Sequence, residues 1–174
     1  MGEGGKDMTR ETLHDVSKEL IAWLRERSDE EVRTLLANMK EYHGFPKTRL
    51  PEDVISSLLK AHRLLPKKMQ IELVRVPTDL SHKAHKHMRA RAFISILGRK
   101  EHLSELKSEE GFAYIGLWLK VKSGDMFDVL PGTVHTFAAK LGMGFEFLSV
   151  QTPPIENGVN DDFELVPIDR CPFL

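Results

Sequence analysis

Two features on which many small proteins depend are missing from this chain. It has a single cysteine, Cys171, so it has no internal disulfide framework and no cysteine-rich zinc module. It also lacks a long hydrophobic run, because the longest nearly apolar stretch, residues 112–119, is far too short to span a bilayer. Residues 1–7 are polar and do not form the apolar core of a signal peptide. We therefore expect a cytoplasmic protein without a membrane segment.

Neither sign of charge is in excess. The 174 residues include 25 Lys and Arg against 26 Asp and Glu, which gives a formal net charge of -1. This balance argues against a protein whose main function is to bind nucleic-acid phosphates or an anionic membrane surface. A chain of this length buries about 70% of the surface that it exposes when unfolded, so its core needs no cross-links.

Residues 1–68 have the hydrophobic spacing of α-helices. Ser28 and Glu31 form a capping-box pattern at the start of a helix, and Gly44 is expected to end that helix. Apolar side chains recur at helical spacing in three stretches, which are 13–24, 32–39 and 54–59. The sequence therefore predicts a helical N-terminal extension over residues 1–68.

From residue 69 onward the hydrophobic period changes to two, which is typical of β-strands. Turn residues separate the strand-like stretches, and no helical pattern lies between them. The expected strands cover residues 71–76, 91–97, 113–121, 126–130, 134–138 and 145–151. Several short strands separated by turns predict an antiparallel sandwich or barrel over residues 69–174.

Histidine is the compositional oddity, with eight in the chain. His85 and His87 lie two residues apart in a stretch that we expect to be extended. Because alternate residues of a strand share a face, these two side chains and Arg91 are predicted to project the same way. Two imidazoles with this spacing can both reach one metal ion at about 2.0–2.2 Å. Further along, a Pro-Gly turn is followed closely by His135.

Together these segments resemble the two sequence motifs of the cupin family, over roughly residues 70 to 168. The sequence departs from the family pattern at Arg91, where the family has a glutamate, and at Ala139, where asparagine is usual. One extra residue also precedes the proline of the second motif. The matching residues are, in order, His85, His87, Gly98, Gly124, Pro131, Gly132 and His135.

The resemblance implies a mainly β fold, the double-stranded β-helix or jelly-roll barrel, preceded here by the α-helical extension. It also implies one divalent metal ion near the mouth of the barrel, with His85, His87 and His135 as ligands. Iron is the expected ion; imidazole ligands also suit zinc, nickel and copper, and manganese is a further alternative. Cupin barrels commonly pair, so a homodimer is expected.

The positive charge of Arg91 is energetically unfavourable beside such an ion. A unit charge about 5 Å from a divalent ion costs roughly 6–7 kcal/mol at an effective dielectric near 20. That is comparable with the whole stability of a domain, about 5–15 kcal/mol. Three alternatives are open: Arg91 turns to a carboxylate such as Glu72 or Glu146, it holds an anionic substrate, or the site has no metal. We favour the second.

The leading functional hypothesis is a three-histidine, non-heme iron dioxygenase that acts on a small carboxylate-bearing substrate bound by Arg91. The alternative is a metal-assisted isomerase, epimerase or lyase for a sugar or sugar acid, in which Glu146 or Tyr114 supplies the base. Residues 152–154 and 161–162 are similar to cupins of sugar metabolism, which favours this alternative. A third hypothesis is a non-catalytic barrel that binds a small molecule. The candidate catalytic residues are thus Arg91, Tyr114 and Glu146.

Overall fold

The structure is a computed structural model that describes residues 9–42, 45–63, 69–77, 83–99, 103–154 and 162–174. Its helices are α1 (Arg10–Arg25), α2 (Asp29–Ala37) and α3 (Glu52–Ala61). Its strands are β1 (Lys40–Tyr42), β2 (Phe45–Arg49), β3 (Gln70–Val76), β4 (His85–Lys86), β5 (Arg91–Arg99), β6 (Gly111–Ile115), β7 (Trp118–Val121), β8 (Met126–Val129), β9 (His135–Ala139), β10 (Phe145–Thr152) and β11 (Glu164–Leu165).

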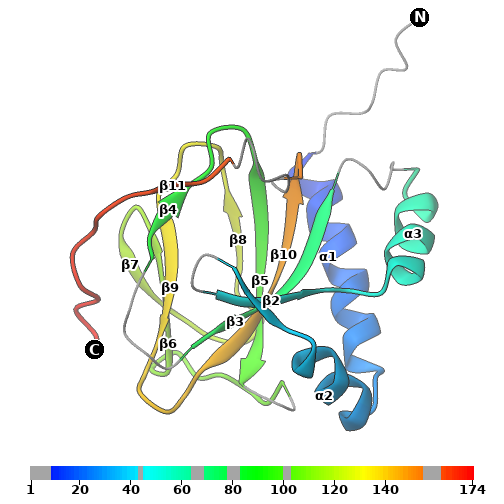
Figure 1. Cartoon of the computed structure of the whole chain (residues 1–174), viewed down its shortest axis with the longest axis horizontal. Helices are drawn as coiled ribbons and strands as arrows, with labels where there is room; N and C mark the ends of the chain where they lie inside the picture. Colours follow the sequence, from blue (N-terminus) through cyan, green and yellow to red (C-terminus); the bar gives the residue numbers. More distant parts are fainter. Residues whose placement is uncertain (1–8, 43–44, 64–68, 78–82, 100–102, 155–161) are drawn as a thin grey trace, which may run out of the picture.

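The strands form two antiparallel sheets that face each other (Figure 1). One sheet has the order β1-β2-β3-β10-β5-β8, and the other has the order β11-β4-β9-β6-β7. If β3 to β10 are numbered 1 to 8, the two sheets read 1-8-3-6 and 2-7-4-5. This is the double Greek-key order of a jelly roll. The predicted fold class, a mainly β double-stranded β-helix with N-terminal helices, is confirmed.

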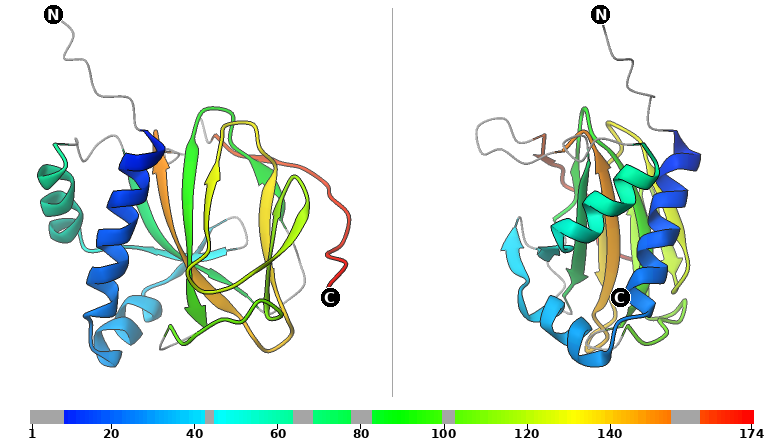
Figure 2. Two further views of the ribbon diagram at one scale, coloured as in Figure 1. Left: turned by 180° about the vertical axis from the view of Figure 1, so that it is seen from behind. Right: turned by 90° about the vertical axis from the view of Figure 1, so that its right-hand side faces the viewer.

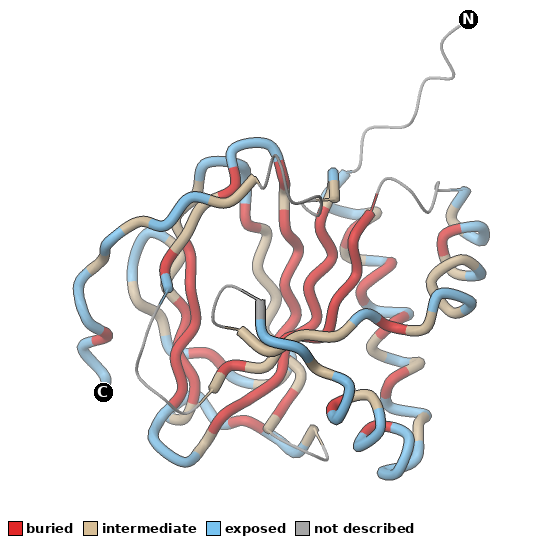
Figure 3. Tube along the Cα trace, viewed as in Figure 1, coloured by how far each residue is buried: buried red, intermediate tan, exposed pale blue. Residues whose placement is uncertain are grey.

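The central strands of the larger sheet, β3, β10 and β5, separate two hydrophobic clusters, because successive side chains point to opposite faces. In β5, Ala92, Ile94 and Ile96 belong to the cluster inside the barrel, whereas Phe93 and Leu97 pack in the cluster beneath the helices. The buried positions in Figure 3 accordingly run along the central strands. In β5, the side chains of even-numbered residues therefore point into the barrel, and those of odd-numbered residues point toward the helices.

Helix α1 covers the outer face of the six-stranded sheet, where it packs on β5 and β10 (Figure 2). Its N-cap residue Thr9 accepts a hydrogen bond from the backbone N–H of Thr12, at 3.2 Å. The predicted capping box of α2 is confirmed, since Ser28 and Glu31 each bind the other's backbone N–H. Within the described part of the chain, no helix is long and apolar enough to cross a membrane.

A β-hairpin between α2 and α3 was not predicted. Strand β2 pairs with β3, with Lys47 opposite Val74, and β1 pairs with the other edge of β2. The N-terminal segment therefore contributes two strands to the barrel sheet as well as three helices. The predicted domain boundary at residue 68 lies outside the described residues and stays a prediction.

Candidate metal centre

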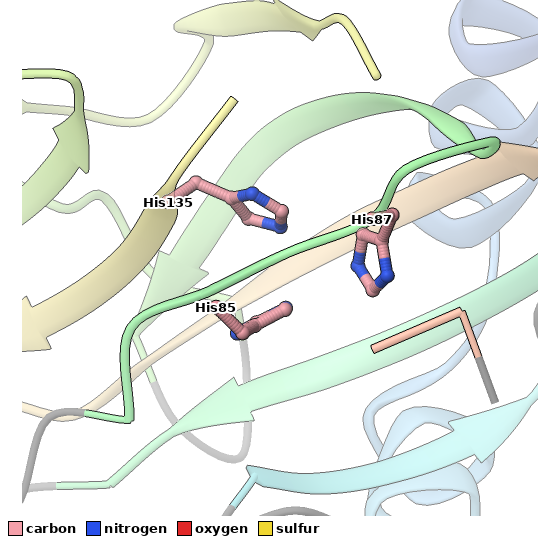
Figure 4. Close-up of side chains that lie close together, drawn as sticks. All are labelled: His85, His87 and His135. Atoms are coloured by element: carbon pink, nitrogen blue, oxygen red, sulfur yellow. The ribbon is translucent and has the colours of Figure 1, made fainter. Parts of the chain in front are cut away.

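The three predicted metal ligands come together inside the barrel. His85 on β4 lies opposite His135 on β9, and His87 follows directly after β4. The ring centroids are 4.3 Å apart for His85 and His135, 4.9 Å for His85 and His87, and 5.2 Å for His87 and His135. Figure 4 shows the three rings around one common space.

Backbone carbonyls orient all three rings. Nδ1 of His85 donates to the carbonyl of Lys83 at 3.0 Å, and Nδ1 of His135 donates to that of Thr133 at 2.9 Å. Nδ1 of His87 donates to the carbonyl of Asp162. Because a carbonyl only accepts, each Nδ1 carries the proton, which leaves Nε2 of each ring with the lone pair that a metal ion could use.

The spacing of the rings is close to that of a metal site. One ring nitrogen from each histidine lies within 4.8 Å of the others. In a tetrahedral site, nitrogens that bind one ion at about 2.0–2.2 Å lie roughly 3.3–3.6 Å apart, so the rings need to move closer by at most about 1.2–1.5 Å. The described residues thus fit a divalent transition metal ion.

Burial keeps the imidazoles of His85 and His135 neutral. It lowers the pKa of His85 to about 2, with the neighbouring His135 adding to the effect. Burial likewise lowers the pKa of His135 to about 4. A protonated imidazole has no lone pair for a metal, so both rings are in their ligating form throughout the neutral pH range.

Asp162 holds the segment that follows His87. Its carboxylate accepts the backbone N–H groups of Met88, Arg89 and Ala90 at 2.6, 2.8 and 2.7 Å. Burial works to raise the pKa of Asp162, but these three hydrogen bonds outweigh it and hold the pKa below its usual range. The same residue thus orients the His87 ring and bends the chain after it. Its neighbour Asp161 lies outside the described residues.

Two glycines of the sequence motifs have clear structural reasons. Gly132 has a φ of +82° in the Pro-Gly turn, and its N–H donates to the carbonyl of His87 at 2.6 Å. This bond ties the first motif to the second. At Gly98, a Cβ would lie 2.4 Å from the carbonyl oxygen of Leu103 and 2.5 Å from that of Ser104, so no larger residue fits.

The cavity beside the histidines has a polar wall that the sequence analysis missed. Lys47 of β2 and Glu72 of β3 line it and form an ion pair at 3.2 Å. Ser149 and Gln151 of β10 line it as well. The remaining lining is mainly aromatic and includes Phe45, Phe137, Phe147 and Phe163. The cavity measures about 50 Å³, which is room for about three or four water-sized groups at roughly 10–15 Å³ each.

The prediction that Arg91 shares a face with the histidines is wrong. The chain bends at residues 88–90, so strand alternation does not carry over from His87 to Arg91. Arg91 opens β5 at an odd-numbered position, on the face beneath α1. There its Nε and Nη2 donate to the two carboxylate oxygens of Asp128 at 2.7 and 2.5 Å. Arg91 thus does turn to a carboxylate, the first of the three alternatives, but its partner is Asp128 and not Glu72 or Glu146.

The structure does not bring the two other catalytic candidates into the cavity. Glu146 is fully buried on β10, and its carboxylate pairs with Arg75 at 3.0 Å. Tyr114 on β6 packs edge-to-face on Trp118, with ring centroids 5.4 Å apart. Neither residue is among those that line the cavity. The base that the isomerase or lyase hypothesis requires must come from elsewhere.

We expect Asp128→Asn to destabilise the protein by about 1–3 kcal/mol at pH 7. This lies between the usual cost of breaking an exposed ion pair and that of breaking a buried one. The hydrogen bond from Arg91 holds the pKa of Asp128 below its usual range. A carboxyl group whose pKa is lower in the folded than in the unfolded protein stabilises the fold at pH values above its unfolded pKa of about 3.9. This contribution is lost as the pH falls through the folded pKa. The deficit of the variant should therefore shrink below about pH 4, as urea unfolding at several pH values would measure.

Arg91→Met supplies the control for this prediction. It removes the same ion pair from the other side and should show the same dependence of stability on pH. Because Arg91 lies on the face opposite the histidines, its replacement should leave metal content unchanged. Loss of metal in Arg91→Met would contradict this placement.

Comparison with known proteins gave structural neighbours only. No family model matches the chain, and no curated protein matches it. The Streptomyces nucleoside dehydratase Pac13 is 13% identical, with 74% of this chain and 83% of that chain covered and a TM-score of 0.47. A cupin-superfamily sugar phosphate isomerase from Silicibacter pomeroyi is 19% identical (64% and 61% covered, TM-score 0.43). An RmlC-like cupin from Shewanella frigidimarina is 12% identical (68% and 84% covered, TM-score 0.47). Cupin-superfamily proteins are thus among the structural neighbours.

Proposed function

We propose that the chain is a cupin whose His85, His87 and His135 bind one divalent transition metal ion, and that it is a metal-dependent enzyme. The observation that supports this most is the set of three Nδ1–H···O=C bonds, which aim the other nitrogen of each ring at one space. Metal-binding histidines characteristically have such a partner on the nitrogen that does not bind the metal.

The donor set suits iron, copper, nickel or zinc. When bound, such an ion acts as a Lewis acid that polarises an oxygen atom of the substrate. The three imidazoles are neutral ligands and leave the charge of the ion uncompensated. Arg91 has no part in this proposal, because it is paired with Asp128 on the outer face of the sheet.

For the reaction we favour proton transfer, as in an isomerase, epimerase or lyase. Such a reaction needs a base beside the substrate, and Glu72 is a buried carboxylate that lines the same cavity as the histidines. Gln70 donates to Oε1 of Glu72 at 2.6 Å, and Lys47 pairs with Oε2. We therefore assign Glu72 as the general base and Lys47 as the group that holds its carboxylate in place.

A dioxygenase acting on a small anionic substrate is the second candidate. The observation that favours it is the ligand set of neutral imidazoles without a carboxylate, inside a cavity with a largely aromatic lining. In this function Lys47 takes the role of substrate cation that we had assigned to Arg91. A homodimer and a cytoplasmic location stay predictions from the sequence.

Elemental analysis of protein purified without chelators tests the metal centre, and we expect about one transition metal ion per chain. The two reactions differ in their need for oxygen. Turnover of small hydroxy acids and sugar acids without oxygen would support proton transfer, whereas oxygen uptake would support the dioxygenase. Metal-free protein that binds small molecules would leave only the non-catalytic barrel.

Glu72→Gln should lower the turnover rate about 10²–10⁴-fold while the metal stays bound, because that is the usual contribution of a general base. Glu146→Gln is the matched control, since it changes a glutamate that is equally buried in the same sheet but points away from the cavity. Equal turnover rates in these two variants would rule out Glu72 as the base.

A further inference from the structure

Two buried polar atoms face the cavity without a protein partner. Among the described residues, Oγ of Ser149 and Oε1 of Gln151 find no hydrogen bond. Their side chains are almost fully enclosed, with exposed fractions of 2% and 8%. A buried polar group without a partner destabilises a fold, so such groups call for an explanation, and a ligand that supplies the missing bonds is one.

These two atoms line the same cavity as the histidines, so one ligand could contact both groups. Ser149 lies opposite Glu72 of β3, and Gln151 lies opposite Gln70. Both alternate with Leu148 and Val150, which pack beneath the helices, so their own side chains point into the barrel. The larger sheet thus presents a polar wall inside the barrel, while the histidines come from the smaller sheet.

The two buried atoms of the wall that find no partner select a ligand that donates hydrogen bonds. The ammonium of Lys47 also belongs to the wall but already pairs with Glu72. Oε1 of Gln151 only accepts, as does the carboxylate of Glu72, and the hydroxyl of Ser149 both donates and accepts. A hydroxyl group on the ligand, which can also do both, satisfies this set. The uncompensated charge of an ion held by three neutral histidines selects a negative group on the other side of the cavity.

We propose that the cavity binds a small hydroxy acid, with its carboxylate toward the histidines and its hydroxyl against Ser149, Gln151 and Glu72. This inference rests on the proposed metal centre. It assigns to Ser149 and Gln151 the role of specificity residues that distinguish a hydroxylated acid from a plain one. The cavity volume of about 50 Å³ restricts the buried part of the ligand to a few heavy atoms.

Calorimetry of the zinc-loaded protein with lactate and propionate tests the inference, because these two acids differ only in the hydroxyl group. Zinc is redox-inert and separates binding from oxidation. We expect at least one lactate enantiomer to bind about tenfold or more tightly than propionate. Sites built to bind a hydroxyl group discriminate strongly against analogues that lack it.

Ser149→Ala should abolish most of this preference by weakening lactate binding while leaving propionate binding unchanged. Ser95→Ala is the matched control: this serine lies on β5 of the same sheet with an exposed fraction of 1%, but it points toward the helices. The ligand-free Ser149→Ala protein should melt at or above the wild-type temperature, because it loses an unsatisfied group. A purely structural serine would lower the melting temperature instead.

The outcomes separate this inference from the proposed function. Zinc binding with equal affinity for lactate and propionate, or with no affinity for either, would overturn the hydroxy-acid assignment and leave the metal centre standing. Equal effects of Ser149→Ala and Ser95→Ala on the preference for lactate would also overturn it. A wild-type protein that binds no zinc would overturn both.

Discussion

Replacing His135 or His87 by alanine should lower the affinity for zinc by more than about a hundredfold in either variant. Loss of an outer-shell partner of a metal ligand already costs about 10–100-fold, and here a direct ligand is removed. The fold should survive, because neither imidazole is part of the two large hydrophobic clusters. Zinc titration by calorimetry and far-UV circular dichroism would measure the two effects.

His62→Ala is the control for these variants. This histidine lies just after α3 and bonds with Glu19 at 3.0 Å, on the helical side of the protein. Its replacement should leave zinc affinity unchanged, which would show that the losses at His87 and His135 are specific to the cavity. If two of the three variants at His85, His87 and His135 kept full zinc occupancy, the proposed ligand set would be wrong.

The pairing of His85 with His87 could be predicted from local spacing, whereas the approach of His135 was predicted from the family resemblance. His85 and His87 are close together in sequence, and the Pro-Gly turn before His135 is itself hydrogen-bonded to His87. Their orientation toward one another follows from the pairing of β4 with β9. The family resemblance supplied that pairing, which the two segments alone do not specify.

The error at Arg91 has a long-range cause. Alternation predicts a shared face only along an uninterrupted strand, and Asp162 interrupts this one by capping residues 88–90 from 72 to 74 positions away in the chain. Nothing in the local sequence indicates that contact. Inside β5, where the strand is uninterrupted, alternation does hold, and Phe93 lies on the same face as Arg91.

Lys47 was missed for a different reason. Strand β2 contains Pro46 and two basic residues, and its residues do not alternate between apolar and polar, so it has little of the usual strand pattern. It is a strand because β3 offers a sheet edge for it to pair with. Glu72 was visible in the sequence, but its role depends on which face of β3 lines the barrel, and the neighbouring strands decide that.

Deleting residues 1–49 should prevent the remaining chain from folding stably. Helix α1 packs on β5 and β10, and its removal exposes three side chains that are now buried: Phe93, Leu148 and Val150. At roughly 1.5–3 kcal/mol for each buried side chain, this loss amounts to about 5–9 kcal/mol. A typical domain has a free energy of unfolding of only about 5–15 kcal/mol.

A single substitution at the same interface tests the contribution of α1 to stability without removing the helix. Leu20 of α1 is fully buried in this cluster, and Leu20→Ala should lower the free energy of unfolding by about 2–5 kcal/mol. Lys18→Ala, on the exposed side of the same helix, should change it by less than about 0.5 kcal/mol. Urea unfolding followed by circular dichroism would compare the variants. A protein without residues 1–49 that is as soluble and as stable as the full chain would contradict this prediction and show that α1 and α2 are dispensable for folding.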